Sequence, residues 1–384
     1  MTNPQNTTPN LQNADRRETL IGAVQSLVRT DLAPIVAAVD QEGLYPSEFL
    51  HKLADIGGFA AAIPVTEGGS GLGLATQIDV ISEVGRECGS TAFLVWCQTT
   101  CAHYLRHSPN EAVRTRHLSA VINGGILAGT GMSNTVKHLS GIENIHLKAR
   151  RDGDSYVVSG ALPWVSNIGD AHLAIVAASV EDGGYVMFAV RGDAKGVTLR
   201  PCPEFAGLEG TQTLNIRMKD VRIPDLDVLA HPDQFKAYMD TIKPGFVLGQ
   251  LGMGFGIIEG SLRTIRESNV TTAHVNQFLD DQGDVLAAEA AALQASALWL
   301  SGQADAGQIP MIDVLRLRLA ASELTLRAAN SAVLHAGAKG YLMRHPAQRR
   351  QREAVFVAIV TPALKHLRKE IHAFEQASAK VQAA

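Results

Sequence analysis

The pattern of apolar and turn-forming residues in this sequence changes twice along its length, and these two changes constrain the fold more than any single motif. In residues 16–39, apolar side chains recur at steps of three and four, which is typical of an amphipathic helix, and similar patterns continue to about residue 122. Between about residues 125 and 229, short runs rich in β-branched and aromatic residues alternate with Gly, Asp and Pro turns. Beyond residue 232 the sequence returns to long helical stretches rich in Ala and Leu. The order of the parts is therefore helical, then β, then helical.

We interpret this order as an α+β multidomain fold. The middle part has the strand and turn spacing of an antiparallel β-barrel or sandwich, and the last part has helices long enough for a four-helix bundle. Ligand sites tend to form where such domains meet. The predicted parts are a disordered polar tail over residues 1–15, an N-terminal helical domain over 16–123, a middle β domain over 124–231 and a C-terminal helical bundle over 232–384.

Composition excludes several classes of partner. Of the 384 residues 19% are charged, the formal net charge is −4, and the basic residues cluster only at Arg349, Arg350 and Arg352. A surface for nucleic acid needs more concentrated positive charge, and we find no apolar stretch of the roughly 18 residues that cross a bilayer. We therefore expect a small-molecule substrate, with neither nucleic acid nor a membrane as partner.

The cysteines indicate the compartment. They are Cys88, Cys97, Cys101 and Cys202. Cys97 and Cys101 share a helical face, but no His or Cys at metal-site spacing completes a ligand shell, so we expect structural free thiols and no metal. The N-terminus lacks the basic start and apolar core of a secretory signal. Together these features predict a cytoplasmic protein.

Six short motifs occur in a defined order along the chain. They are Ile63-Pro64, Glu67-Gly68-Gly69-Ser70-Gly71-Leu72, Asp154-Ser155-Tyr156-Val157-Val158-Ser159-Gly160, Trp164-Val165-Ser166-Asn167, Lys219-Asp220-Val221-Arg222-Ile223-Pro224 and Gly337-Ala338-Lys339-Gly340-Tyr341. In this order the chain resembles the acyl-CoA dehydrogenase family of flavoproteins from about residue 16 to 375. The resemblance implies FAD between the β domain and the C-terminal bundle, and a homodimer or homotetramer whose neighbouring subunit covers the dinucleotide.

The same resemblance places the flavin contacts on two strands. Trp164 would offer an aromatic face beside the flavin, while Val165 and Ser166 would hydrogen-bond its polar edge. The alternative for Trp164 is burial in the core of the β domain. Counting back from Trp164 without gaps, the residues on the other flavin-contacting strand are Met132, Ser133 and Asn134.

Other candidate ligand contacts lie farther along the chain. Gly337 and Gly340 resemble a glycine pair that approaches the FAD pyrophosphate, although an ordinary helix C-cap is the alternative. Arg266 is what remains of the family's Arg-x-x-Phe-Gly pattern that grips FAD. Ser140 falls on a serine that lies near the ligand, with a plain polar turn as the alternative. Lys243 is a candidate cation of the substrate channel.

The expected catalytic carboxylate is missing. The dehydrogenases remove an α-proton with a general base, usually a Glu that would stand at Thr361, and a threonine hydroxyl cannot serve as that base at neutral pH. A minority of the family places the Glu before an Arg-Pro pair that Lys243-Pro244 resembles, and this chain has Ile242 there. The nearest carboxylate, Asp240, is either a relocated base or an N-cap or solvated charge. The catalytic base therefore stays unknown.

A second branch of the same fold also resembles this chain. Flavin monooxygenases similar to dibenzothiophene monooxygenase receive reduced FMN or FAD from a reductase as an exchangeable co-substrate. Their Pro-containing turn resembles Thr361-Pro362, and their Asn and Ser resemble Asn134 and Ser166, which can donate hydrogen bonds where no strong base is needed. The His of that branch is here Val360. His103 either approaches the cleft or is structural.

Three hypotheses follow for the function. The first, which we favour, is an FAD-dependent oxidoreductase acting on an acyl-CoA thioester by CH–CH oxidation or by a variant reaction without the usual Glu, with an electron-transfer flavoprotein as a candidate partner. The second is the two-component monooxygenase, which needs a flavin reductase. The third is a non-catalytic subunit that completes the site of an active paralogue.

Overall fold

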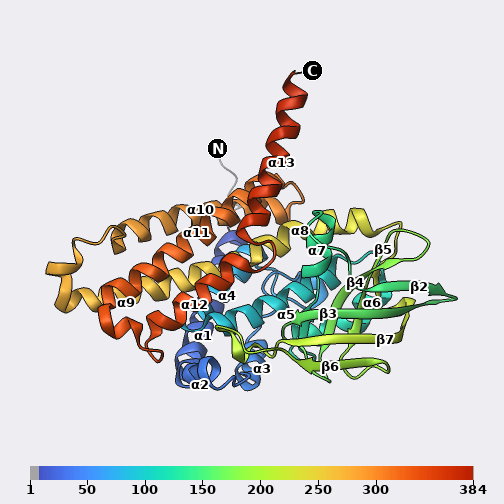
Figure 1. Cartoon of the computed structure of the whole chain (residues 1–384), viewed down its shortest axis with the longest axis horizontal. Helices are drawn as coiled ribbons and strands as arrows, with labels where there is room; N and C mark the ends of the chain where they lie inside the picture. The colour runs from blue at the N-terminus through green and yellow to red at the C-terminus, as the bar shows by residue number, and fades with distance from the viewer. Residues whose placement is uncertain (1–7, 384) are drawn as a thin grey trace.

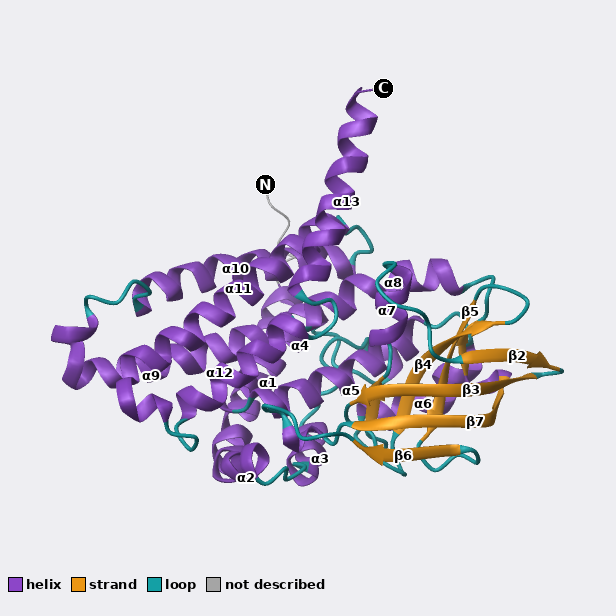
Figure 2. Cartoon of the chain, viewed as in Figure 1, coloured by secondary structure: helices purple, strands orange, loops and turns teal. Residues whose placement is uncertain are grey.

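The computed structural model describes residues 8–383. Figure 1 shows the sheet at one end of the molecule and the long helices of the C-terminal part at the other. Figure 2 shows that helices flank the sheet and make up most of the structure. The predicted succession of a helical, a β and a second helical part is confirmed.

The N-terminal domain is helical, as predicted, but it begins earlier and is less regular. Helix α1 starts at Thr8, so residues 8–15, predicted as a disordered tail, are helical, while residues 1–7 lie outside the described part. The predicted single helix over 16–39 changes its winding after Leu27 because Pro34 has no N–H for the α-helical ladder. The elements are α1 (Thr8–Leu27), a π-helical turn (Val28–Leu32), a 3-10 turn (Ala33–Ile35), α2 (Val36–Gln41), α3 (Ser47–Asp55), α4 (Gly73–Glu87), α5 (Gly89–His107) and α6 (Glu111–Ile122).

The middle domain is one mixed sheet rather than the antiparallel barrel or sandwich that we predicted. Its strand order is β6-β7-β3-β2-β4-β5-β8, with β1 beside β4. Both β1 and β2 run parallel to β4 and pair with different halves of it, and hydrophobic patterning carries no information about strand direction. The elements are β1 (Ala128–Thr130), α7 (Ser133–Leu139), β2 (Lys148–Asp152), β3 (Ser155–Val165), β4 (Leu173–Val180), β5 (Tyr185–Arg191), β6 (Val197–Pro201), β7 (Leu214–Pro224) and β8 (Val228–Ala230).

Strands β4 and β5 are buried on both faces. Along β4, Leu173 and Ile175 pack into the core shared with the helices, whereas Ala174 and Val176 pack into a separate core inside the β domain. This alternation follows from the period of two in a strand. It explains why β4 reads as a continuous apolar run, and it fixes the sheet against the helices.

The C-terminal domain contains the predicted helical bundle. Helices α9, α10, α11 and α12 pack on one another, and α9 also packs on α4 of the N-terminal domain. The crossing of α9 and α4 is close because glycines meet there: a Cβ on Gly256 would lie 2.5 Å from the carbonyl oxygen of Ser82. The helices are α8 (Phe235–Gly249), α9 (Leu251–Asn276), α10 (Gly283–Asp305), α11 (Met311–Ala336), α12 (Pro346–Ile359) and α13 (Leu364–Ala383), the last of which projects from the body (Figure 1).

Our expectation that no stretch is apolar and long enough to cross a bilayer was wrong by the criteria of length and composition alone. Three helical stretches meet these criteria, namely Gln12–Gln41, Phe235–Asn276 and Gly283–Asp305. In Phe235–Asn276, 89% of the apolar window is buried inside the protein. Its hydropathy is explained by a central position in the helical core, where Gly, Leu, Ile and Phe are buried among neighbouring helices.

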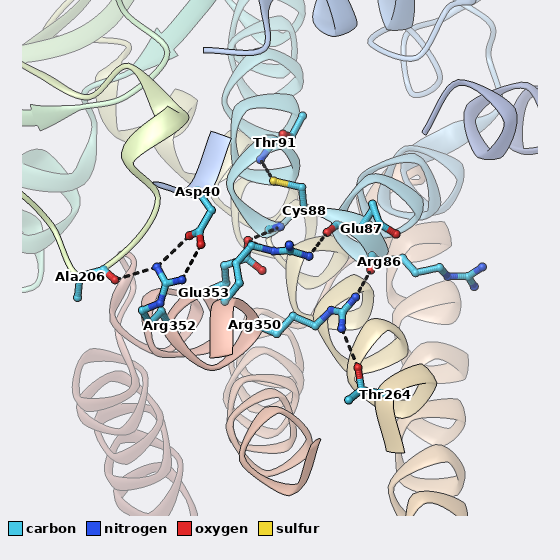
Figure 3. A network of polar contacts seen from close by, with 12 residues as sticks. Asp40, Arg86, Glu87, Cys88, Thr91, Ala206, Thr264, Arg350, Arg352 and Glu353 are labelled. Atoms are coloured by element: carbon cyan, nitrogen blue, oxygen red, sulfur yellow. Dashed lines mark hydrogen bonds and ion pairs between the residues drawn. The ribbon is translucent and has the colours of Figure 1, made fainter. Parts of the chain in front are cut away.

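Arg352 of α12 joins all three domains through its side chain. Its guanidinium donates to both carboxylate oxygens of Asp40 in α2, at 2.8 and 2.6 Å, and to the carbonyl oxygen of Ala206 in the β domain at 3.2 Å. Figure 3 shows Arg352 between these two partners. On the next residue, Glu353 accepts from the backbone N–H of Gly89 at the start of α5. The bidentate pair of Arg352 and Asp40 sets the orientation of the two side chains as well as their distance.

We predict that Asp40→Ala destabilises the protein by at least about 2 kcal/mol, because it leaves the largely buried guanidinium of Arg352 without its carboxylate. Urea unfolding of the wild type and the variant measures this difference. Asp240→Ala is the matched control, since Asp240 forms an exposed ion pair with Lys236 and its loss should change stability by less than about 0.5 kcal/mol. Equal effects of the two substitutions would show that the domain junction does not depend on Arg352.

Candidate functional site

A cavity of about 450 Å³ lies where the three domains meet, and we call it the Trp164 cavity. It is bordered by α5 of the N-terminal domain, by the β1, β3 and β7 ends of the sheet, and by α8 and α12 of the bundle. Its lining residues are Phe93, Trp96, Thr130, Ser133, Lys137, Trp164, Ser166, Phe205, Ala206, Gly207, Leu208, Thr211, Thr213, Phe246, Arg352, Val355, Phe356, Ile359, Val360 and Thr361. The predicted cleft between domains is therefore present.

Trp164 lies at the rim of this cavity and not in a β core. Its φ is +59°, at a point where the pairing of β3 with β7 shifts register after Leu162. This irregularity turns the indole out of the sheet, and 60% of Trp164 is exposed. The next residue, Val165, has its side chain buried in the β core, so only its backbone is available to a ligand. The structure thus favours the ligand-facing interpretation of Trp164.

Paired hydroxyl groups line the polar side of the cavity. Ser133 and Thr361 contact each other through their hydroxyl oxygens at 2.7 Å. Ser166 contacts Thr213 at 2.6 Å, and Thr213 contacts Thr211 at 2.8 Å. Each hydroxyl both donates and accepts, so these groups can bind the edge of a polar ring without carrying charge.

The opposite wall is aromatic, and the sequence interpretation missed it. Phe93 and Trp96 of α5 stack with ring centroids 5.6 Å apart, Trp96 packs on Phe246 of α8 at 5.3 Å, and Phe93 meets Phe356 of α12 edge-on at 4.6 Å. These four rings come from three helices. The spacing of Phe93 and Trp96 on one helical face was visible in the sequence, but their partners are distant along the chain.

Among the described residues, no carboxylate lines the Trp164 cavity, and its charged side chains are Lys137 and Arg352. Thr361 faces the cavity at the position where the resemblance calls for a base. Ile242 is buried, and Asp240 is 66% exposed at its side chain and paired with Lys236 at 2.7 Å. The structure therefore favours the interpretation of Asp240 as a solvated charge.

Two of the three residues predicted on the other flavin strand do not reach this cavity. Asn134 is buried in α7, where its amide donates to Glu143 at 2.7 Å and its carbonyl oxygen accepts from the backbone N–H of His146 at 2.9 Å. Met132 lines a neighbouring cavity instead, and Ser133 alone faces the Trp164 cavity. The predicted strand is absent at Asn134, because a helix forms at this point and turns Asn134 toward its own loop.

The neighbouring space, which we call the Lys243 cavity, has a volume of about 650 Å³ and lies between α7, α8 and α13. Both predicted substrate contacts, Ser140 and Lys243, line it. Glu370 of α13 joins them, since it accepts from Ser140 at 2.7 Å, from His366 at 2.9 Å and from Lys243 at 2.9 Å. Lys236, Asp240 and Lys369 line the same cavity, and Lys236 pairs with Asp240, so its charged lining carries one more ammonium than carboxylates.

These contacts control the ionisation of Glu370. Burial alone would raise the pKa of this carboxyl, but the hydrogen bond from His366, the ammonium of Lys243 and the hydroxyl of Ser140 outweigh burial and lower the pKa to about 2. Glu370 is therefore a fixed anion near neutral pH. It is a poor proton acceptor and holds Lys243 in place.

A third space of about 440 Å³, the His103 cavity, lies between α4, α5, α8 and the start of the α10–α11 connection. The Nε2 of His103 lies 3.1 Å from the carbonyl oxygen of Ile242, and burial together with the neighbouring His107 lowers the pKa of His103 to about 3. A histidine that stays neutral and donates to a helix backbone fits the structural interpretation. His103 does not line the Trp164 cavity.

The residues predicted to grip the outer part of the cofactor lie apart from these three cavities. Arg266 is exposed on α9. Gly337 has a φ of +62° and caps α11 through its backbone N–H, which fits the C-cap interpretation. A Cβ on Gly340 would lie 2.8 Å from the carbonyl oxygen of Val333 in the same chain, so this chain itself requires the glycine. Contact of these three residues with a dinucleotide stays a prediction.

The cysteines are free, as expected, and Cys88, Cys97 and Cys101 are buried. Burial raises the pKa of the Cys88 thiol to about 11 and keeps it protonated near neutral pH. Within residues 8–383, no group of His, Cys, Asp and Glu has the geometry to hold a metal ion.

Sequence comparisons with known proteins all point to one family. Family models described as the N-terminal and middle domains of acyl-CoA dehydrogenase match residues 14–125 and 131–221. A probable acyl-CoA dehydrogenase of Bacillus subtilis is 27% identical over 353 residues, covering 88% of this chain and 91% of the relative. The human mitochondrial short-chain specific acyl-CoA dehydrogenase is 26% identical over 359 residues, covering 88% and 85%.

Solved structures share the fold. Butyryl-CoA dehydrogenase from Megasphaera elsdenii superposes with a TM-score of 0.84 at 19% identity, covering 94% of this chain and 98% of that one. Dibenzothiophene monooxygenase from a Paenibacillus species superposes with a TM-score of 0.79 at 16% identity, covering 92% and 96%. Both branches considered from the sequence therefore have the architecture seen here.

We predict that the stabilising contribution of Glu370 depends on pH. Its pKa is depressed from 4.5 to about 2 in the folded protein, so its contribution is complete above about pH 5.5 and is lost as the pH falls from there toward 2. The gap corresponds to at most about 3.4 kcal/mol, and to less where solvent screens the partly exposed carboxylate. Urea unfolding of wild type and Glu370→Gln should show a stability difference at pH 7 that shrinks at pH 3. A difference that is the same at both pH values would contradict the assigned pairing.

Proposed function

This chain belongs to the acyl-CoA dehydrogenase family, and from that premise we propose that it is a flavin-dependent oxidoreductase that binds FAD in the Trp164 cavity and acts on an acyl thioester. The proposal rests above all on the Trp164 cavity, which joins an outward-turned indole to paired hydroxyls and an aromatic wall. It goes beyond family membership in naming the cofactor, the substrate class and the residues involved.

The Trp164 cavity suits the ring system of a flavin. Trp164 supplies an aromatic face that is turned out of the sheet, and Ser133, Ser166 and Thr361 supply hydroxyls for a polar edge. When bound, FAD would supply the capacity to accept a hydride or two electrons. The residues of this chain bind and orient the ring, and the apolar wall around Trp96 keeps water from the reacting face.

The Lys243 cavity supports a thioester substrate that carries phosphate. Lys236, Lys243 and Lys369 line it, Lys236 is paired with Asp240 and Lys243 with Glu370, and the three ammonium groups outnumber the two carboxylates. Ammonium groups on flexible stems bind phosphate as point charges. An acyl-CoA whose phosphates lie at these lysines would extend its acyl group inward toward Phe246, which borders both this cavity and the Trp164 cavity.

The reaction is proposed to proceed without a carboxylate base in this chain. A hydroxyl such as that of Thr361 holds its proton near neutral pH, so it can orient a thioester or a flavin edge but cannot remove an unactivated α-proton. CH–CH oxidation by this chain therefore needs a substrate whose α-proton is already acidic, or another variant of the family reaction. The hydrogen bond between Thr361 and Ser133 keeps both hydroxyls directed at the cavity.

The paired hydroxyls also support a second candidate, a two-component monooxygenase that takes reduced FMN or FAD from a flavin reductase. Such chemistry needs hydrogen-bond donors beside the flavin and no strong base, and the fold is shared with dibenzothiophene monooxygenase. Purified protein that is colourless but consumes oxygen when given reduced flavin would favour this candidate. Purified protein that is yellow and is bleached anaerobically by an acyl-CoA would favour the first.

The missing carboxylate supports a third candidate, a non-catalytic subunit that completes the site of an active paralogue. Exposed apolar side chains surround the Trp164 cavity, among them Trp164, Val355 and Ile359. They support our proposal of a homodimer or homotetramer, or of a pairing with such a paralogue. Activity that arises only after co-purification with a Glu-containing paralogue would favour the third candidate.

Partner and compartment remain proposals. An electron-transfer flavoprotein is proposed as the oxidant for the first candidate. A solved structure from work on an electron transferring flavoprotein of Acidaminococcus fermentans shares this fold, with a TM-score of 0.85 at 19% identity. A cytoplasmic location is proposed on the strength of the free thiols.

We predict that Trp164→Ala weakens FAD binding by at least about tenfold while the protein stays folded. The indole is exposed and its removal leaves no buried void, whereas its loss takes away a stacking face. Fluorescence titration of the apoprotein with FAD measures the affinity, and circular dichroism checks the fold. Leu226→Ala is a control at an exposed apolar residue outside the cavity. Unchanged FAD affinity in Trp164→Ala would remove Trp164 from the site.

We predict that Thr361→Glu creates acyl-CoA-dependent flavin reduction. The carboxylate would stand beside Ser133 in a cavity without another carboxylate among its described lining residues, and a positioned general base typically contributes 10²–10⁴-fold. Anaerobic bleaching of the flavin by butyryl-CoA is the measurement, and Thr361→Gln is the control of similar size without a base. Equal bleaching rates in Thr361→Glu, Thr361→Gln and wild type would argue against a thioester at this position.

A further inference from the structure

Trp96 forms part of a wall between two cavities. On one side its indole lines the Trp164 cavity. On the other side is Gly249 of α8, which lines the His103 cavity, and a Cβ added to Gly249 would lie 3.1 Å from the indole ring. The indole therefore fills the space between α5 and α8 at the point where a glycine gives it room.

The indole is held in this position. Trp96 is buried, it stacks on Phe93 with an interplanar angle of 13°, and its other neighbour is the ring of Phe246. Its Nε1–H donates to the carbonyl oxygen of Phe246 at 3.4 Å. A buried tryptophan whose N–H has a partner and whose ring packs on two other aromatic rings keeps a single orientation.

The space behind the indole is large and partly apolar. The His103 cavity has a volume of about 440 Å³, close to the 450 Å³ of the Trp164 cavity. The same two helices border both spaces, because Thr99 and Thr100 follow Trp96 on α5 and Gly249 follows Phe246 on α8. The apolar residues that line the His103 cavity include Phe59, Ile63, Leu74, Ile81 and Ile309. The indole and Gly249 thus lie between the two cavities, and we expect removal of the indole to connect them between α5 and α8.

We propose that Trp96 sets the length of the acyl group that this protein accepts. This inference rests on the proposed function, in which the acyl group of a thioester enters the Trp164 cavity beside the flavin. The acyl chain ends at the indole, so the preferred substrates carry short acyl groups. Trp96 is thus a specificity-determining residue, and the His103 cavity is a closed extension of the acyl site.

Chain length provides a quantitative test. Each methylene that moves from water into an apolar cavity gains about fourfold in affinity. In the wild type this gain stops where the chain meets the indole, and longer chains bind more weakly because they must displace it. In Trp96→Ala the gain continues into the His103 cavity, so affinity should keep rising from hexanoyl to decanoyl.

The experiment measures binding in the FAD-loaded full-length protein. Butyryl-, hexanoyl-, octanoyl- and decanoyl-CoA are titrated into wild type and Trp96→Ala by calorimetry under anaerobic conditions, so the readout does not require turnover. We expect the tightest binding at butyryl- or hexanoyl-CoA for the wild type, and at least about tenfold tighter decanoyl-CoA binding for Trp96→Ala than for the wild type.

Two controls distinguish the opening of a passage into the His103 cavity from a general loss of packing around the acyl site. Phe93→Ala removes a ring from the Trp164 cavity, but Phe93 does not line the His103 cavity, so its longest accepted chain should stay shorter than that of Trp96→Ala. Adding Thr100→Leu to Trp96→Ala partly fills the His103 cavity and should reverse the gain for decanoyl-CoA. If Trp96→Ala does not fold, Trp96→Leu keeps an apolar side chain and should give a smaller gain of the same sign.

The outcomes separate this inference from the proposed function. If the wild type binds FAD and short acyl-CoA but the Trp96 variants show the same chain-length profile as the wild type, the role of Trp96 is wrong and the proposed function stands. A wild type that already binds decanoyl-CoA best also overturns the role of Trp96. If neither the wild type nor any variant binds an acyl-CoA of any length, the proposed substrate class itself is wrong.

Discussion

The pairing of Arg352 with Asp40 and Ala206 is the contact on which the rest of the site depends. One guanidinium, at 2.6 to 3.2 Å from its acceptors, ties the first helical domain, the β domain and the bundle together at the rim of the Trp164 cavity. Because a bidentate pair fixes orientation, it sets how α12 faces the sheet. The position of Thr361, two residues beyond the end of α12, follows from that constraint.

A second constraint acts behind Thr361. Arg318 of α11 is buried and donates to Gln250 and to the carbonyl oxygen of Val357, while Gln250 donates to the carbonyl oxygen of Thr361. Burial lowers the pKa of Arg318 to about 10, which still leaves it charged near neutral pH. The backbone around Thr361 is thus held by Arg318 of α11 and by Gln250, the residue between α8 and α9. Such support keeps a hydroxyl in place without a carboxylate.

Much of the site could be predicted from the sequence, and the failures have physical causes. The Trp164 motif, the count back from it and the expected place of the missing Glu led to Ser166, Ser133 and Thr361, which the structure places around one cavity. The same count failed for Asn134 because α7 forms there and turns the amide to its own loop. Local helix formation changes side-chain direction without changing residue number.

The sequence by itself determined the order of the domains, the absence of a Glu at position 361 and the positions of several cavity residues, because periodicity and motif spacing are local properties of the chain. Only the tertiary structure decided that the sheet is mixed, that Glu370 pairs with Lys243, and that Trp96 separates two cavities. These features depend on contacts between segments far apart in sequence. Strand direction, ion pairing and the shape of empty space arise from how domains pack, and local patterns do not encode them.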